Sequence, residues 1–491
     1  MPFTEYPEYD AIGLAALVRK REVRPSELAE AAIERIEAFN PAVNAVVYKA
    51  YDHARALAAQ QDASEPSGPL FGVPFLLKDI LGDCEGWPTT LSSRAFSDRV
   101  MPYDSELVSR FKRAGVVFVG KTNAPEFGIL PTTEGQFYGP ARNPWNTEYS
   151  TGGSSGGAAA AVATGMVPIA HGNDGGGSIR IPASCCGVVG LKPTRARNSM
   201  APDFGDLLGG LLDEHALTRT VRDSAALLDA THGPVPGDPY RAPPVSGTFL
   251  NDALREPGRL RVAFSRTDPF GRPLHADCLA GVDATAKLLE SLGHTVEEAQ
   301  PQIEAQGFVE AFSAMWFAGI AYAIDLVSLQ SGRTLQPGDL ENLTHAVHAR
   351  GRAISAVEFQ FAELVMQQAG REMGRFHQTY DCWLTPTLAT PPLRNGVIDV
   401  RESDLDKTYA PLIDYSPFTA IQNASGQPSI SLPLHWSGAG LPVGMMFSAD
   451  AGNEGLLFQL AAQLEQARPW KDRRPGMVLQ HDARQRDLVT A

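Results

Sequence analysis

The sequence predicts an α/β protein in which helices cover the faces of a β-sheet. The first observation behind this prediction is that segments with helical periodicity alternate with short apolar runs, joined by short connections. The second is the length of 491 residues, which allows one large α/β unit or two or three domains. The third is that no stretch resembles a free linker or an internal repeat. Together they favour one large domain.

The first half of the chain supplies the clearest elements. A helix is expected over 26–39, where Ser26 is a plausible N-cap and Asn40-Pro41 ends the apolar periodicity. Short apolar runs bounded by glycine or proline predict buried strands. The other segments assigned in this half are helices at 50–63, 105–114 and 158–164, and strands at 71–80, 115–123 and 166–172.

The second half begins with a loop rich in proline and glycine at 234–257. A strand at 260–265 and a helix at 276–292 follow, and the chain from about 308 to 380 is mainly helical. Strand character returns at 382–387 and 428–434, before an amphipathic helix at 456–467. The long helical stretch therefore reads as an insertion into the α/β pattern.

Charge and cysteine content exclude several classes of protein. The net charge is −14 and no basic run reverses it, which disfavours nucleic acid and anionic membrane as partners. The five cysteines are irregularly spaced without a CxxC pair, so neither a disulfide framework nor a zinc knuckle is expected. The N-terminus lacks the apolar core of a signal peptide, and the uncharged segment 149–173 has too short an apolar part to span a bilayer. We expect a cytoplasmic protein.

Lys78 stands inside the apolar run "PFLLKDI". One interpretation is a lysine at the end of a strand, paired with Asp79. The other is a buried amine, whose pKa falls because burial disfavours the ammonium, so that it can act as a base near neutral pH. The residues around Lys78 leave both interpretations open.

Two glycine–serine clusters lie close together in "STGGSSGGAAAAVATGMVPIAHGNDGGGSIRIPASCCG". The first contains "GGSSG", which matches a nucleophile elbow in which Ser154 attacks with a histidine such as His435, but polar residues precede it where an apolar strand is required. A phosphate-binding loop would require a G-K-[ST] motif, which this segment lacks. A plain surface loop would not need this much glycine. In the second, three glycines before Ser178 could aim several N–H groups at one oxyanion, or could simply form a tight turn.

The combined motifs resemble the amidase signature family. Its glycine–serine core is matched by "GGSSGG", its serine segment by "GGSIRIPAS" and its lysine segment by "GVPFLLKDI"; "GKTNAPEFG", "GVVGLKPTRAR", "ASGQPSISLPL" and "GLPVGMMF" add support. The resemblance implies one large twisted mixed β-sheet, covered by helices on both faces, in a single domain over 1–491. Its signature core would span about 65–230, the helical insertion about 300–380 and the C-terminal return to the sheet 381–470.

The resemblance also implies the roles of individual residues. Ser178 would be the nucleophile, Ser154 the bridging serine after a cis peptide bond, and Lys78 the terminal base. The oxyanion hole would be formed by the N–H groups of Gly175, Gly176, Gly177 and Ser178. Supporting hydrogen bonds would come from Ser155, Asp174 and Arg180, although Arg180 equally suits a structural salt bridge. His171 would be structural. No cofactor and no metal is expected.

The position of Gly175 departs from many family members, which carry a threonine or isoleucine there, so more room or mobility is expected beside the oxyanion hole. The sequence "HGND" and the C-terminal "AAQLEQARPW" look most similar to the branch that hydrolyses nylon oligomers. The substrate would be a small linear or cyclic carboxamide. Its pocket would be built by 125–137, 312–322 and 444–447, with the candidates Phe127, Trp316, Phe317 and Met446.

Alternative functions remain open. A carbamate (urethane), an aryl-acylamide or an ester could be hydrolysed by the same three residues. A glutamyl-tRNA amidotransferase-type subunit, which depends on partners, and the esterase built on Ser154 are further readings. A homodimer is compatible with the sequence.

Overall fold

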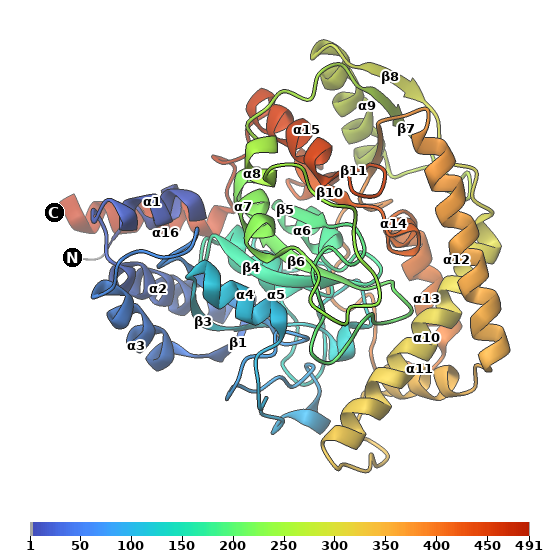
Figure 1. The fold of residues 1–491 in the computed structure, drawn as a ribbon, viewed down its shortest axis with the longest axis horizontal. Coiled ribbons are helices and arrows are strands. Elements are labelled where there is room, and N and C mark those ends of the chain that lie inside the picture. The colour runs from blue at the N-terminus through green and yellow to red at the C-terminus, as the bar shows by residue number, and fades with distance from the viewer. Residues whose placement is uncertain (1–2, 491) are drawn as a thin grey trace.

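Eleven strands form one mixed sheet through the centre of the protein (Figure 1). The structure is a computed structural model that describes the backbone of residues 3–490 and the side chains of residues 3–485. The strand order is β1-β3-β2-β4-β6-β5-β10-β11-β9-β7-β8. The strands are β1 (Val46–Lys49), β2 (Pro74–Lys78), β3 (Val117–Thr122), β4 (Ile169–Asp174), β5 (Val189–Lys192), β6 (Asp213–Thr218), β7 (Arg261–Phe264), β8 (Thr295–Glu298), β9 (Cys382–Pro386), β10 (Ser429–Trp436) and β11 (Pro442–Ser448).

Both parallel and antiparallel pairs occur in this sheet, and all pairs from β4 through to β9 in the strand order are antiparallel. β2 pairs in parallel with β3 and β4, whereas β6 runs antiparallel to β4 and β5. β10 and β11 run antiparallel, and β7 pairs in parallel with β8 and β9. The predicted fold class, α/β with one large mixed sheet, is therefore confirmed.

Helices cover the sheet on both faces. Gly444 and Met445 are neighbours on β11 and so point to opposite faces. A Cβ at Gly444 would lie 2.7 Å from Ser184 of α6, whereas a Cβ at Gly281 of α9 would lie 2.7 Å from the Met445 side chain. The helices are α1 (Ala11–Arg19), α2 (Pro25–Val43), α3 (Tyr51–Asp62), α4 (Glu106–Ala114), α5 (Gly156–Ala163), α6 (Arg180–Cys186), α7 (Val221–Thr231), α8 (Phe249–Asp252), α9 (Ala276–Ser291), α10 (Ala305–Gln330), α11 (Asn342–Arg352), α12 (Ala356–His377), α13 (Leu405–Tyr415), α14 (Thr419–Ser425), α15 (Glu454–Ala467) and α16 (Gly476–Thr490).

Helix α2 differs from its prediction at both ends. Its N-cap is Arg24, whose N–H is satisfied by the Glu27 side chain at 2.9 Å, so Ser26 already lies inside the helix. Pro41 does not end it, because a proline in the last turn removes only one helical donor. The helix continues to Val43 and stops at Asn44, which adopts a left-handed conformation with φ 49°.

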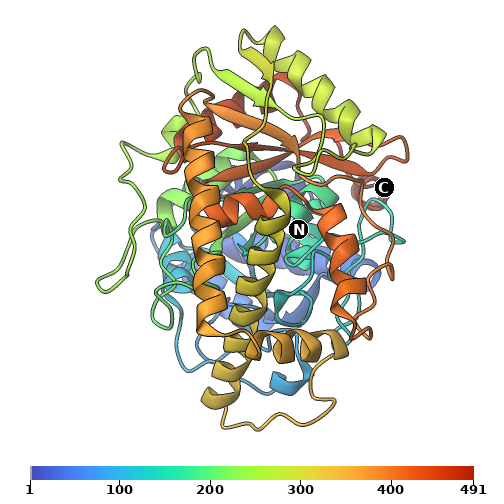
Figure 2. The ribbon, with the colours of Figure 1, turned by 90° about the vertical axis from the view of Figure 1, so that its right-hand side faces the viewer.

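The helical insertion is a layer built from α10, α11 and α12, beside which α13 runs (Figure 2). α10 packs against both α11 and α12. Within the described chain, α10 is the one helix long and apolar enough to cross a membrane, and its buried face contributes to the core. The five cysteines are all buried and none is paired with another.

Candidate active site

Lys78 is the last residue of β2 and is completely buried. Its Nζ lies 2.7 Å from Ser154 Oγ, 3.0 Å from Ser155 Oγ and 2.6 Å from Asn173 Oδ1. A pairing with Asp79 is not what holds the amine, because the Asp79 carboxylate accepts from the N–H and hydroxyl of Thr90. Strand β2 therefore places the Lys78 amine against the first glycine–serine cluster.

The neighbours of Lys78 fix the direction of each of its hydrogen bonds. The Asn173 side-chain amide donates to the Ile80 carbonyl at 3.0 Å, so its Oδ1 can only accept. The Ser155 hydroxyl donates to the Asn173 carbonyl at 3.3 Å, so its oxygen is free to accept from Nζ. A neutral amine has two hydrogens and one lone pair. Both hydrogens are thus used by Asn173 and Ser155, and the lone pair is left for the Ser154 hydroxyl.

The protein interior lowers the proton affinity of this amine. Burial lowers the pKa of Lys78 to about 7, although the nearby Asp174 carboxylate acts in the opposite direction. The Lys78 backbone N–H donates to His171 Nδ1 at 3.2 Å, so the His171 proton lies on Nε2, which faces Glu214 Oε2 at 3.0 Å. Burial lowers the pKa of His171 to about 3, so the ring is neutral. His171 thus supports the lysine backbone, a contact that its sequence position did not indicate.

The first cluster is glycine-rich because its backbone touches other backbone. Ser154 follows a cis peptide bond from Gly153. A Cβ at Gly153 would lie 2.4 Å from the Thr132 carbonyl oxygen, and one at Gly157 would lie 2.4 Å from the Asn123 nitrogen. No strand precedes Ser154 among the described residues, as residues 151–153 are irregular. The nucleophile-elbow interpretation is therefore wrong, because an elbow needs a strand leading into the serine.

The second cluster is held in place by polar side chains. Gly177 has φ 131°, which favours glycine, and its N–H donates to Asp174 Oδ1 at 2.7 Å. The Gly176 carbonyl accepts from Thr419 Oγ1 at 2.6 Å. Of the four N–H groups expected to bind an oxyanion, that of Gly177 is thus occupied by Asp174. Those of Gly175, Gly176 and Ser178 have no acceptor in the described part of the chain.

Asp174 and Arg180 form a fully buried ion pair beneath this cluster. The guanidinium donates to the carboxylate through Nε at 2.9 Å and Nη2 at 2.8 Å. Asn423 donates to Asp174 and accepts from Arg180, joining α14 to the pair. The guanidinium and these hydrogen bonds hold the pKa of the Asp174 carboxyl well below its usual range, against the effect of burial. The pair therefore stays ionised and fixes the turn that carries Ser178.

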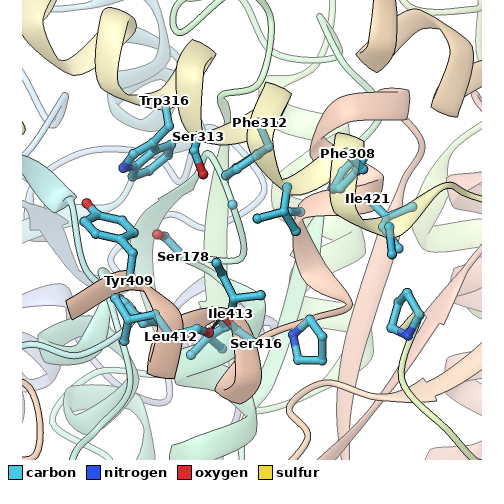
Figure 3. Close-up of a pocket in the computed structure, with 18 of the residues that line it drawn as sticks. Ser178, Phe308, Phe312, Ser313, Trp316, Tyr409, Leu412, Ile413, Ser416 and Ile421 are labelled. Atoms are coloured by element: carbon cyan, nitrogen blue, oxygen red, sulfur yellow. Dashed lines mark hydrogen bonds between the residues drawn. The ribbon is translucent and has the colours of Figure 1, made fainter. Parts of the chain in front are cut away.

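Ser178 lies where two cavities meet, and both are lined mainly by apolar side chains. The larger cavity lies between α10 and α13 and is lined by residues that include Phe308, Phe312, Trp316, Tyr409 and Ile413 (Figure 3). The smaller cavity also contains Ser154 and is lined by residues that include Phe127, Leu208, Ile320 and Leu326. Ser155 N–H donates to the Ser178 carbonyl at 3.1 Å, which ties the two serine segments together.

The predicted pocket residues divide into two pairs. Phe127 lines the smaller cavity, and Trp316 lines both. Phe317 lines neither and packs edge-on against Tyr409, with ring centroids 5.1 Å apart. Met446 lies under Arg180, with its sulfur 3.6 Å from Nη1. Neighbouring residues on a helix point about 100° apart, so Phe317 turns away from the space that Trp316 faces.

Three polar residues of the site were missed by the sequence analysis. Asn173 stands within the quoted "HGND", where its place directly before Asp174 on a buried strand was an unused signal. Thr419 and Asn423 come from α14, more than two hundred residues further along, and no local pattern points to them. Within the described residues, no three His, Cys, Asp or Glu side chains gather as metal ligands.

A family model described as Amidase matches residues 27–458. The chain is 38% identical over 486 residues to a 6-aminohexanoate-cyclic-dimer hydrolase of Paenarthrobacter ureafaciens, covering 96% of this chain and 97% of that protein. It is 34% identical over 476 residues to an acylamidase of Rhodococcus erythropolis, covering 95% and 97%. The solved structure of a 6-aminohexanoate cyclic dimer hydrolase with its substrate superimposes with a TM-score of 0.91 at 37% identity, covering 96% and 99%. A bacterial aryl acylamidase of the amidase signature family superimposes with a TM-score of 0.86 at 30% identity, covering 94% and 96%. The resemblance read from the motifs is therefore confirmed, including its nylon-oligomer branch.

Proposed function

The chain belongs to the amidase family and is an amidase, and we propose that it hydrolyses small linear or cyclic carboxamides through Ser178, Ser154 and Lys78, by way of an acyl-enzyme. The observation that carries this proposal is the set of hydrogen bonds at Lys78 Nζ. Two of its three partners can only accept, so the neutral amine can take a proton only from Ser154. A proton relay through a serine requires that the base accept a hydrogen bond from that serine alone, as Lys78 does from Ser154.

The first half-reaction forms the acyl-enzyme. Ser178 Oγ attacks the amide carbon as its proton passes to Ser154 Oγ and the Ser154 proton passes to Lys78 Nζ. The new C–O bond places negative charge on the former carbonyl oxygen. The N–H groups of Gly175, Gly176 and Ser178 are the donors available to stabilise it.

The acyl-enzyme is complete once the C–N bond breaks, and the second half-reaction then releases the acid. As the C–N bond breaks, Ser154 gives its proton to the leaving nitrogen and is reprotonated by Lys78. Water then attacks the ester carbon, and its proton follows the same route to Lys78. When the C–O bond to Ser178 breaks, the proton returns to Ser178 Oγ, and the enzyme is restored.

A carbamate or an aryl acylamide offers the same acyl carbon and nitrogen leaving group, so both stay within this proposal, as does an ester with an oxygen leaving group. The relatives named as acylamidase and cyclic-dimer hydrolase support the amide as the principal substrate. We further propose that the substrate is a small molecule, that the protein is cytoplasmic and that it forms a homodimer.

The test is turnover of a simple anilide by the purified chain alone. Mass spectrometry of the quenched reaction is expected to show the acyl group on the peptide that contains Ser178. Ser178→Ala should remove both turnover and adduct, and Lys78→Ala should remove turnover. His435→Ala should leave activity unchanged, because His435 lies on β10 and lines neither cavity. An adduct on Ser154, or activity only with an added partner, would refute the proposal.

A further inference from the structure

The two cavities beside Ser178 share a chemical character that limits what they can bind. Among the described residues, neither wall contains an aspartate, glutamate, lysine, arginine or histidine. The polar side-chain groups of the larger cavity are uncharged: hydroxyls, such as those of Ser313 and Tyr409, and the indole N–H of Trp316. A charge placed in such surroundings loses its hydration without gaining a partner, which is costly. Both cavities therefore suit uncharged groups.

The larger cavity also has a planar wall. Phe308, Phe312 and Trp316 recur every four residues on one face of α10, and Figure 3 shows them leading towards Ser178. Their rings are stacked, with centroids 6.2 and 5.9 Å apart and interplanar angles of 20° and 17°. This row of rings offers a continuous apolar surface for an extended or planar group.

Ser154 distinguishes the two cavities from each other. It lines the smaller cavity but not the larger one, while Ser178 lines both. Gly128, whose Cβ would lie 3.2 Å from Ser154 Oγ, stands at the junction. The group that receives a proton from Ser154 must therefore enter from the side of the smaller cavity.

On the basis of the proposed function, in which Ser154 returns the proton to the leaving nitrogen, we propose that the smaller cavity receives the amine half of the substrate and the larger cavity the acyl half, and that both halves are uncharged and apolar. The amine then leaves through surroundings that stabilise no ammonium ion. Aromatic amines, which stay neutral at pH 7, fit this cavity better than alkylamines. The substrate class is thus an N-aryl amide or carbamate with an apolar acyl group.

The experiment compares three amides with the same reacting bond. N-phenylhexanamide is uncharged, the monoanilide of adipic acid carries a carboxylate on its acyl half, and N-(4-carboxyphenyl)hexanamide carries one on its amine half. Each carboxylate is expected to lower kcat/KM by about 100-fold, because it is buried without a partner. Charged substrates that react as fast as the uncharged one would overturn the proposed substrate class.

Two lysine variants then test which cavity takes which half. Ile413 lines the larger cavity and Leu326 the smaller one, and both are partly exposed, so a lysine can be accommodated. Ile413→Lys should recover hydrolysis of the adipic monoanilide by about 10-fold or more, and Leu326→Lys that of the carboxyphenyl amide. The opposite pattern would overturn the assignment. Leu329→Lys, which places the same charge on an exposed part of α10, should recover neither.

A binding measurement separates this inference from the proposed function. Calorimetry with Ser178→Ala reads the preference for the three amides without turnover. If the wild-type chain hydrolyses none of them while Ser178→Ala binds the uncharged amide best and each lysine variant shifts binding as above, the mechanism fails and the cavity assignment stands. If a lysine variant does not fold, Ile413→Trp and Leu326→Trp take its place: the first should exclude long acyl groups and the second bulky amines.

Discussion

Lys78 Nζ donates a hydrogen bond of 2.6 Å to Asn173 Oδ1, and both side chains are buried. The asparagine amide is itself fixed by its bond to the Ile80 carbonyl, so the lysine cannot exchange this acceptor for another. Asn173 therefore does two things at once: it aims the amine at Ser154, and it does so without a negative charge. A carboxylate in the same place would bind the ammonium form and remove the base.

Asn173→Asp should move the pH dependence of the enzyme. With the pKa of Lys78 at about 7, kcat/KM of the wild type is expected to rise through neutral pH as the lysine loses its proton. An anionic neighbour favours the ammonium, so the rise in Asn173→Asp should move to higher pH by about 1 to 3 pH units. The measurement is kcat/KM for an anilide between pH 5.5 and 10.

The matched control is Asn173→Leu, which has a similar shape and no charge. It removes the acceptor that aims the amine at Ser154, so it should lower kcat/KM. Because it adds no negative charge, it should not move the rise of kcat/KM to higher pH. If kcat/KM of Asn173→Asp rises at the same pH as that of the wild type, the rise does not reflect deprotonation of Lys78. The assignment of Lys78 as the base is then contradicted.

Lys78→Met should show that the base is maintained at the expense of stability. The ordinary lysine pKa is 10.5 and that of folded Lys78 is about 7, so between these pH values the unfolded chain binds more protons. The free energy of unfolding of the wild type therefore rises with pH across this window. The stability of Lys78→Met relative to wild type should fall by about 2 to 5 kcal/mol from pH 7 to pH 10.

Urea unfolding at several pH values measures this difference. Lys287→Met removes a charge from an exposed position of α9 and serves as the control. Its stability relative to wild type is expected to change little over the same range. An equally constant difference for Lys78→Met would mean that the amine is protonated in the folded protein at neutral pH.

Thr419→Val should impair catalysis without loosening the fold. The Thr419 hydroxyl holds the Gly176 carbonyl, and with it the plane of the Gly176–Gly177 peptide beside Ser178. Valine keeps the shape but loses this bond, so the peptide is held only by the Gly177 N–H bond to Asp174, and the neighbouring N–H donors are aimed less well. We expect kcat to fall by about 10- to 100-fold with little change in KM. Thr419→Ser should retain most of the activity, whereas an unchanged kcat in Thr419→Val would contradict the positioning role.

The contrast between Lys78 and Thr419 shows what could be predicted from sequence. Lys78, Ser154 and Ser178 stand in local motifs, and the resemblance of these motifs to the family predicted their grouping. Thr419 reaches Gly176 only because β10 and α14 return to the sheet after the insertion. The α/β class followed from the alternation of elements and the mixed sheet from the resemblance to the family, but neither predicted which face of each helix is exposed. Periodicity could not decide between Trp316 and Phe317, because both are buried and only the packing of α13 makes one of them face a cavity.

Gly175→Ala should be destabilising because the room expected at this position is already filled. A Cβ there would lie 3.1 Å from Trp316 Cζ3 and Leu212 Cδ1 and 3.2 Å from Leu208 Cδ1. All three neighbours also line the smaller cavity, so they must shift into it by a few tenths of an ångström to admit the methyl group. Overpacking of this kind costs about 1–3 kcal/mol. The added methyl also pushes on the N–H donors next to Ser178, so kcat should fall by about 10-fold or more.

Trp316→Phe tests whether crowding against Trp316 causes the destabilisation by Gly175→Ala, because phenylalanine lacks the Cζ3 atom that the new methyl group would meet. Gly175→Ala combined with Trp316→Phe should therefore lose less stability than the sum of the two single changes, with a coupling of about 0.5–3 kcal/mol. Gly374→Ala is the control: its Cβ would meet nothing within 4 Å on α12, so it should stabilise the protein by up to about 1 kcal/mol. Thermal unfolding and kcat of the wild type and the four variants measure both effects. Strict additivity of the two changes would mean that Trp316 does not confine Gly175, and that the glycine is required for another reason.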